Sequence, residues 1–168
     1  MEKTLEIYTD GSSLGNPGPG GWGVVIINNE EPTSTTGGLK IKNDIELGGG
    51  EKNTTNNRME LQAVIEAFKY ISTLKDQINE IKKVNIFADS NYVLLGITSW
   101  VNNWEKNGWR TANKKEVLNQ DLWKELIILV RIYGNKINWG KVKGHSGHIY
   151  NDKADEIATR YAGIQNRN

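Results

Sequence analysis

The sequence predicts an α/β fold in which helices pack on the faces of a mixed β-sheet. Residues 5–10 alternate apolar and polar side chains, which is the period of a half-buried strand. Residues 58–73 and 122–132 instead carry apolar side chains at helical spacing. In chain order we expect three strands, a helix, a strand, helices, a strand and a last helix. That order favours a mixed sheet covered by helices.

The composition fits one globular domain. The 168 residues suffice for a single core, which we assign to residues 1–163, followed by a short polar tail at 164–168. Hydrophobic residues make up 37%, and no apolar run approaches the roughly 20 residues that span a membrane. The absence of cysteine excludes disulfides, thiolate metal sites and cysteine nucleophiles. With a net charge of only +1, a nucleic-acid partner has to be recognised from local clusters of cations.

The N-terminal segment predicts the location of the protein. Residues 1–6 are charged and lead directly into a strand, without the apolar core of a signal peptide. We therefore expect a cytoplasmic protein that does not associate with membranes. Because no extra domain is evident, we also expect a monomer without an obligate protein partner.

Residues 11–23 are rich in glycine and proline and follow Asp10, at the end of the first strand. We expect turns there, with exposed backbone amides that could hold an anion, although a simple hairpin turn also explains them. Residues 22–27 are predicted to form the second strand. Short apolar segments at 39–41 and 45–47 are predicted to form its hairpin partner, with an extra short strand or extension.

Glu60 lies where the next loop ends and the helix 58–73 begins. If Asn57 is the N-cap, Glu60 is the third helical residue, where an acid stabilises the first turn. The residues four, seven and eleven positions beyond Glu60 are apolar, however, so Glu60 shares a core-facing stripe. A carboxylate on such a stripe needs a partner. Both interpretations are open at this point.

Other acids also stand at the edges of elements. Asp89 follows the strand 84–88, either as a helix N-cap or at the carboxyl edge of the sheet, where ligands bind. The last helix starts near Asn151 and carries Asp152 and Asp155 in its first turns. If the fold gathers several acids, they raise one another's pKa unless cations bind. Oxygen ligands favour Mg²⁺ or Mn²⁺, and two ions about 3.5–4 Å apart could promote phosphodiester cleavage.

Residues 99–115 interleave tryptophans with cations. Trp100 and Trp104 share a helical face, which packing against the body would explain. The functional alternative is a basic, aromatic projection that grips a phosphate backbone and offers stacking planes. Four cations and Glu105 together give this segment a charge of +3. The residues concerned are Trp100, Trp104, Trp109, Lys106, Arg110, Lys114 and Lys115.

The two histidines, His145 and His148, lie in a glycine-flanked loop after the predicted last strand, 136–142. Their spacing without a second ligand pair is weak evidence for zinc. The glycines suit a mobile loop that moves a proton. His148 could equally be exposed and without a role.

Five ordered segments, covering almost the whole chain, resemble bacterial type 1 ribonuclease H. They are Tyr8–Ser12, Gly15–Gly21, Thr54–Leu61, Ala88–Ser90, and Val142–His148 with Asp155 after it. The resemblance implies a five-stranded mixed sheet in the order 3-2-1-4-5 with helices on both faces. It also implies an endonuclease that hydrolyses the RNA strand of RNA/DNA hybrids and leaves 5′-phosphate and 3′-hydroxyl ends.

The same resemblance implies site residues. Two Mg²⁺ ions, replaceable by Mn²⁺, are expected on Asp10, Glu60, Asp89 and Asp155. The family's last acid lies ten residues beyond the loop histidine, which selects Asp155 over Asp152. His145 is expected to assist the attacking water or product release. Expected substrate contacts are Gly11, Asn16, Asn56, Asn57 and Asn91 to the minor groove or 2′-hydroxyls, Thr55 to a DNA phosphate, and Trp100, Trp104, Trp109, Lys114 and Lys115 in the basic protrusion.

Two features depart from the family pattern. Glu105 and Asn107 reduce the positive charge of the protrusion, which bears on the strength of hybrid binding. The connection between the second and third strands is longer than expected, and its sequence indicates no role. A noncatalytic hybrid-binding module is the alternative from another class, but it would be expected to lack an acid. Other nucleases or transposases of this broad fold generally lack the Thr54–Leu61 segment and the Gly-His-Ser-Gly-His loop.

Overall fold

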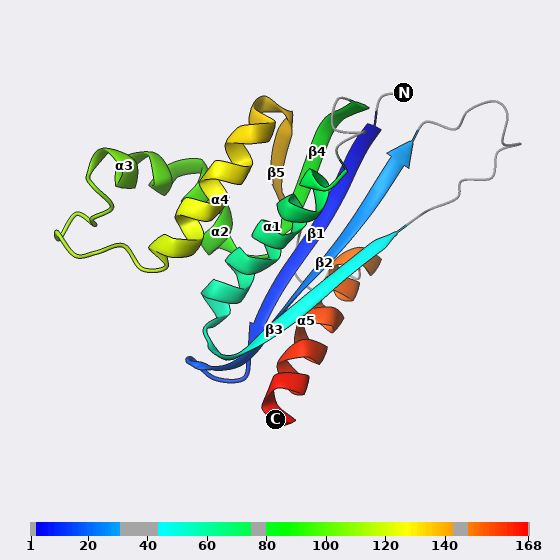
Figure 1. Cartoon of the computed structure of the whole chain (residues 1–168), viewed down its shortest axis with the longest axis horizontal. Helices are drawn as coiled ribbons and strands as arrows, with labels where there is room; N and C mark the ends of the chain where they lie inside the picture. Colours follow the sequence, from blue (N-terminus) through cyan, green and yellow to red (C-terminus); the bar gives the residue numbers. More distant parts are fainter. Residues whose placement is uncertain (1–2, 31–43, 75–79, 143–147, 168) are drawn as a thin grey trace, which may run out of the picture.

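The computed structural model describes residues 3–30, 44–74, 80–142 and 148–167. Five strands form one sheet in the order β3-β2-β1-β4-β5, with β1 antiparallel to β2 and parallel to β4 (Figure 1). This confirms the mixed sheet and its predicted strand order. The strands are β1 Lys3–Ser13, β2 Gly18–Glu30, β3 Ile45–Thr54, β4 Ile81–Ala88 and β5 Ile137–Lys141.

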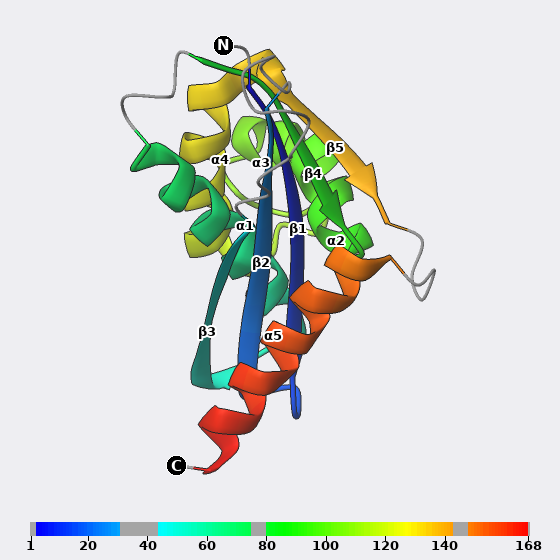
Figure 2. The ribbon, with the colours of Figure 1, turned by 90° about the vertical axis from the view of Figure 1, so that its right-hand side faces the viewer.

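Helices cover both faces of the sheet, as expected. The long helices α1 and α4 lie on one face, and α5 crosses the other face (Figure 2). The described helices are α1 Asn56–Ser72, α2 Asn91–Leu95, the π-helical turn η2 Gly96–Trp100, α3 Val101–Lys106, α4 Gln120–Tyr133, the 3₁₀ turn η3 Gly134–Lys136 and α5 Ile149–Arg167. Among these, none combines the length and apolar character needed to cross a membrane. Helix α5 continues through residues 164–167, where we expected a polar tail.

Alternation along β1 divides its side chains between two cores. Leu5 and Ile7 point into the larger core, which α1 and α4 complete. Tyr8 belongs to the smaller core beneath α5, together with Val25 and Ile157. The sheet is therefore buried on both sides along β1, and the end of this central strand is a rigid place for functional side chains.

Of the two interpretations of residues 11–23, the simple hairpin turn is confirmed, and it is shorter than the glycine-rich segment suggested. Strand β1 continues to Ser13 and β2 begins at Gly18, so the connecting turn is short. Gly21 and Gly23 are paired with β1 and β3 within the sheet, which leaves their amides unavailable for an anion. A Cβ on Gly21 would lie 2.2 Å from the Ala158 carbonyl oxygen of α5. These glycines therefore allow close packing of a helix on the sheet.

The hairpin partner of β2 is β3, which is longer than the predicted segment 45–47 and runs on to Thr54. The other predicted segment, 39–41, lies outside the described residues. Helix α1 begins two residues earlier than expected, because Thr55, with an extended backbone, is its N-cap. Likewise, Ser90 and not Asp89 caps α2, since the Ser90 hydroxyl accepts from the Val93 N–H at 3.4 Å.

Candidate active site

Two of the four acids, Asp10 and Asp89, lie at the same edge of the sheet, on the neighbouring parallel strands β1 and β4 or directly after them. The register pairs Thr9 of β1 with Ala88 of β4, so Asp10 and Asp89 follow at equivalent positions. Asp10 is held in place because its Oδ1 accepts from the Gly11 N–H at 2.9 Å. Asp89 is exposed.

Gly11 brings the third acid to the same place. A Cβ on Gly11 would lie 2.3 Å from the backbone nitrogen of Glu60 and 2.4 Å from the carbonyl carbon of Met59. Only glycine lets β1 pass directly against the backbone of α1 here. The carboxyl group of Glu60 therefore reaches the neighbourhood of Asp10.

The structure decides between the two interpretations of Glu60. With Thr55 as N-cap, Glu60 is the fifth residue of α1, so the capping interpretation was wrong. The Glu60 side chain is only 5% exposed, and its Oε2 has no hydrogen-bond partner among the described residues. An orphaned, buried carboxylate oxygen is costly unless a proton or a cation binds it.

The pKa values of Asp10 and Glu60 are raised, and neighbouring acids contribute to both shifts. Burial, followed by hydrogen bonding to Asp155, raises the pKa of Asp10 from 3.8 to about 7. Burial raises the pKa of Glu60 well above its usual value, and the charges of Asp10 and Asp89 raise it further. Asp10 therefore interacts with both Glu60 and Asp155, and Glu60 interacts with Asp89. Asp155 comes from α5, on the opposite face of the sheet from α1.

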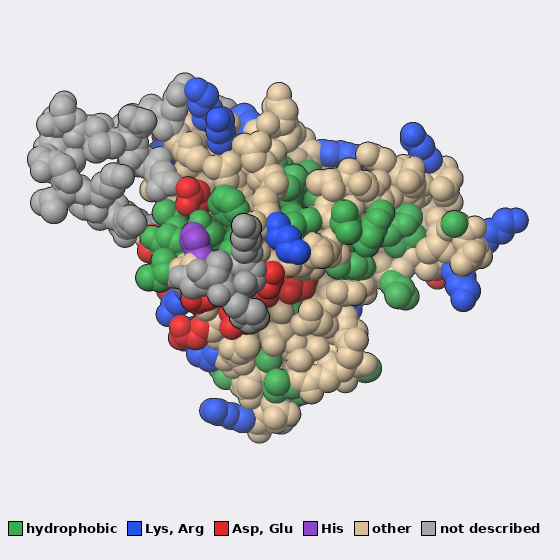
Figure 3. All heavy atoms as spheres, turned by 180° about the vertical axis from the view of Figure 1, so that it is seen from behind, with side chains coloured by type: hydrophobic (Ala, Val, Ile, Leu, Met, Phe, Trp, Pro, Cys, Tyr) green, Lys and Arg blue, Asp and Glu red, His purple; other side chains and the backbone are tan. Residues whose placement is uncertain are grey.

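The donor set fits a divalent cation. Within the described ranges, no group of three or more acidic and histidine side chains is already arranged to hold a metal ion. The Oε2 of Glu60 nonetheless has no partner there, and burial and the hydrogen bond to Asp155 raise the pKa of Asp10, so a divalent cation would stabilise both carboxylates. The donors are all oxygens, which suits Mg²⁺ or Mn²⁺. Figure 3 shows Asp and Glu side chains gathered close together on the side of the molecule opposite to that of Figure 1.

Most of the predicted groove-binding side chains surround these acids. Gly11 lies beside Asp10, and Asn56 and Asn57 are exposed in the first turn of α1. Asn16 reaches across from the β1–β2 turn, where its Oδ1 accepts from the Asn56 N–H at 3.4 Å. Asn91 begins α2, two residues beyond Asp89. Residues that could bind substrate therefore lie close along the chain to Asp10, Glu60 and Asp89.

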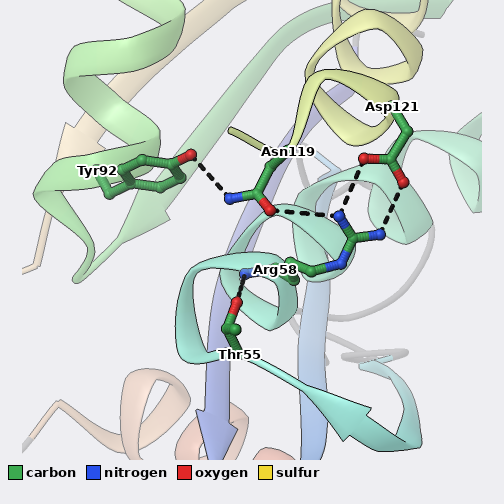
Figure 4. Close-up of polar contacts among 5 residues, drawn as sticks. All are labelled: Thr55, Arg58, Tyr92, Asn119 and Asp121. Atoms are coloured by element: carbon green, nitrogen blue, oxygen red, sulfur yellow. Dashed lines mark hydrogen bonds and ion pairs between the residues drawn. The ribbon is translucent and has the colours of Figure 1, made fainter. Parts of the chain in front are cut away.

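A polar network next to Thr55 was missed in the sequence analysis. Arg58 pairs with Asp121 through two hydrogen bonds of 2.9 and 2.7 Å, and also donates to Asn119 at 3.3 Å (Figure 4). Asn119 in turn donates to the Tyr92 hydroxyl at 3.0 Å. Hydrogen bonding within the pair raises the pKa of Arg58 and lowers that of Asp121. The network connects α1, α2 and α4; only the place of Arg58 in the motif 54–61 hinted at it.

Comparisons with known proteins decide the family. A model of the RNase H family matches residues 2–163. The chain belongs to the RNase H family. It is 46% identical to the ribonuclease H of Dechloromonas aromatica (strain RCB), over 95% of this chain and 93% of that protein. It is 45% identical to a ribonuclease HI of Neisseria meningitidis serogroup B, over 96% of this chain and 97% of that one.

A solved structure agrees with these relatives. LC9-RNase H1, described as a type 1 RNase H with the type 2 active-site motif, superposes with a TM-score of 0.79. The two are 33% identical, over 98% of this chain and 74% of that one. The resemblance to type 1 ribonuclease H is confirmed, and with it the enzyme class, a ribonuclease H that is an endoribonuclease and a hydrolase.

The tryptophan-rich projection of this RNase H is built on ring-to-ring packing. The rings of Trp100, Trp104 and Trp109 follow one another at centroid distances of 5.9 and 6.0 Å, and Trp104 also meets the buried Trp123 at 5.4 Å. All three projecting rings are half-buried, which supports the packing interpretation. Their predicted contact with substrate stays a prediction.

The cations of the projection are exposed. Lys and Arg side chains lie at its outer end (Figure 3). Lys124 of α4 adds a further cation, 5.2 Å from the ring centre of Trp109. Glu105, which we expected to reduce the charge here, forms an ion pair with Arg131 of α4. The acid therefore anchors α3 to the body of the RNase H. The exposed cations are Lys106, Arg110, Lys114 and Lys115.

Of the two histidines, His145 lies outside the described residues. His148 is exposed but not without contacts, because its ring stacks on Tyr8 at a centroid distance of 4.9 Å. Burial, with the neighbouring Glu6, raises the pKa of Tyr8 to about 12, so its hydroxyl stays protonated. His148 thus helps to seat the start of α5, the helix that carries Asp155.

Proposed function

We propose that this RNase H is an endonuclease that hydrolyses the RNA strand of RNA/DNA hybrids by two-metal-ion catalysis, leaving 5′-phosphate and 3′-hydroxyl ends. One observation carries the proposal. Asp10, Glu60, Asp89 and Asp155 converge from two strands and two helices, and one buried carboxylate oxygen lacks any partner in the described chain. Family membership supports the same reaction.

The four carboxylates would hold two Mg²⁺ ions, with Mn²⁺ as a possible substitute. When bound, such ions supply an activated water and stabilise charge on the leaving oxygen of a phosphodiester. The chain's own part is to present ionised carboxylates from rigid elements. Burial raises the pKa of Asp10 to about 7, so binding a cation there would also favour loss of its proton. A role of His145 in assisting the water or product release belongs to the same proposal.

Substrate recognition is proposed for the amides around the acids. Asn16, Asn56, Asn57 and Asn91, with the backbone of Gly11, offer hydrogen bonds that a 2′-hydroxyl can complete and DNA cannot. Thr55 would contact a DNA phosphate. Trp100, Trp104, Trp109, Lys114 and Lys115 would bind the backbone further out. We propose that residues 1–163 form the catalytic unit and that it works as a monomer.

The test uses labelled substrates of equal sequence. RNA/DNA hybrid, double-stranded RNA and double-stranded DNA are incubated with Mg²⁺ and, separately, with a chelator. Cutting of only the RNA strand of the hybrid, only with Mg²⁺, and with the stated ends is expected. Equal cutting of all three duplexes, or cutting in chelator, would contradict the proposal, and binding without cutting would favour a noncatalytic hybrid-binding module.

A further inference from the structure

Lys141 is a cation at the edge of the sheet where the acids converge. It is the last residue of β5, and the register pairs it with Ala88, the residue before Asp89. Lys141 and Asp89 therefore stand near the ends of neighbouring parallel strands. The Lys141 side chain is exposed, and nothing in the sequence analysis drew attention to it.

The Lys141 ammonium makes one specific contact. Its Nζ donates to Oδ1 of Asn91 at 2.9 Å. Asn91 is exposed and begins α2, so the contact joins the end of β5 to the helix that follows Asp89. Within the described ranges, Nδ2 of Asn91 forms no hydrogen bond.

This contact determines which end of the Asn91 amide faces outward. An ammonium group has three N–H donors and no acceptor, so the atom it contacts must be the carbonyl oxygen. Because the amide is planar, Nδ2 then points away from Lys141. Asn91 is thereby set to donate hydrogen bonds and not to accept them. Without the cation, the amide could turn over and present either end.

We propose that Lys141 is a positioning residue that acts through Asn91: it orients the amide so that Nδ2 donates into the minor groove of a bound RNA/DNA hybrid. This inference rests on the proposed function. Base pairs present mostly acceptors in the minor groove, namely purine N3 and pyrimidine O2, and the RNA strand adds 2′-hydroxyl oxygens. A donor held outward by a cation complements that surface, whereas an outward carbonyl would face acceptors.

The experiment is a double-mutant cycle on hybrid cleavage with Mg²⁺. Lys141→Met and Asn91→Ala should each raise KM about 5- to 10-fold while kcat stays within about twofold, since each removes roughly one hydrogen bond to substrate. The double variant should be no worse than Asn91→Ala alone, because Lys141 acts only through Asn91. Lys141→Arg should restore most of the affinity. Asn91→Asp, which keeps the acceptor for Lys141 but loses Nδ2, should be as defective as Asn91→Ala.

Lys83→Met is the matched control. Lys83 is an exposed lysine of β4 that pairs with Thr4 at the far end of the sheet, so its loss changes the net charge equally and should leave KM unchanged. The proposal would be overturned if the effects of the two substitutions on KM were additive in the double variant and the salt dependence of KM weakened only when Lys141 is removed. That result would indicate that Lys141 contacts a phosphate directly. An unchanged KM in Lys141→Met would overturn it as well. Failure of the unaltered protein to cut hybrid would instead contradict the proposed function.

Discussion

At the scale of single residues, Asp10 and Glu60 lie close to other carboxyl groups, and both are shielded from solvent by burial. Glu60 is buried with an unpartnered oxygen, and burial, followed by the hydrogen bond to Asp155, raises the pKa of Asp10 to about 7. Such groups do not stabilise the folded protein, because burying a charge costs free energy. Cations at the proposed metal site would offset this cost.

Asp10→Asn should therefore abolish cleavage, with kcat reduced on the order of 10³-fold or more, while hybrid binding stays detectable. The amide retains the size of Asp10 but cannot carry its charge. Steady-state kinetics and a binding titration measure the two effects. Asp152→Asn is the matched control, an exposed acid of α5 only three residues from Asp155, and should cut normally. Cleavage retained by Asp10→Asn would remove Asp10 from the metal site.

The raised pKa of Asp10 also predicts how metal-free stability depends on pH. The folded protein holds this proton more tightly than the unfolded chain, so the associated stabilisation is complete below about pH 3.8 and is lost as the pH rises towards 7. In chelator, the melting temperature of the wild type should fall relative to that of Asp10→Asn across this range. Mg²⁺ at pH 8 should raise it again. Parallel melting curves for the two proteins would contradict the prediction.

At the scale of elements, the start of α1 shows how the site depends on local helix geometry. The N-cap is Thr55, whose Oγ1 accepts from the Arg58 N–H at 3.2 Å. Asn57 is left exposed inside the first turn. Because α1 starts two residues earlier than predicted, Glu60 lies beyond the capping positions. It is instead located where α1 packs against β1.

Thr55→Ala should lower the free energy of unfolding by about 1 kcal/mol, because the Arg58 N–H loses its acceptor. Asn57→Ala should change it by less than about 0.5 kcal/mol, since Asn57 does not cap the helix. Urea denaturation without substrate compares the two. Equal losses would restore Asn57 as a capping residue.

Gly11→Ala should both destabilise the protein and impair cleavage. The added methyl group would overlap backbone atoms of Met59 and Glu60, which cannot move aside as a flexible side chain could. Separating β1 from α1 should cost about 1–3 kcal/mol and displace Glu60 from Asp10. Gly163→Ala, in α5 with no atom within 4 Å of the added carbon, is the control and should be neutral or slightly stabilising. Normal melting and activity of Gly11→Ala would contradict the close approach.

At the scale of the whole molecule, charge is separated although the net charge is only +1. Acids gather where β1, β4, α1 and α5 meet, while the projection built from η2, α3 and the following loop carries exposed cations. Glu105 does not weaken this arrangement as much as its position suggests, because it is paired with Arg131. A polyanionic duplex could thus bind with one part on the projection and the reacting part near the acids.

Replacing both Lys114 and Lys115 by Ala should raise KM for the hybrid with little change in kcat. If each contacts one phosphate, the slope of log KM against log salt should fall by about two. Kinetics at several salt concentrations measure this. A loss of kcat with an unchanged salt slope would place the two lysines outside the substrate path.

The sequence by itself was sufficient for the mixed sheet and the approximate positions of the long helices, because hydrophobic period is a local property of the chain. The family, and with it the strand order, followed from the resemblance of its motifs, whereas the assignment of the four acids to a metal site stays a prediction. The sequence suggested Asn57 as the N-cap of α1, where the cap is Thr55, and it left open whether Asp89 caps α2. The sequence cannot distinguish a glycine in a turn from a glycine where a helix packs closely on a sheet. Asn57 and Thr55 are both able to cap a helix, and only their backbone conformations show which of them does so. The network of Arg58, Asn119 and Asp121, and the contact of Lys141 with Asn91, join residues far apart in the chain.

Only the tertiary structure could decide these points. The parallel register of β1 and β4 sets Asp10 beside Asp89, and the missing side chain of Gly11 lets Glu60 approach them. Burial then raises the pKa of Asp10 and Glu60, an effect that depends on all neighbouring elements together. The sequence determines which acidic side chains are present, whereas the distances between them and their pKa values depend on the folded chain.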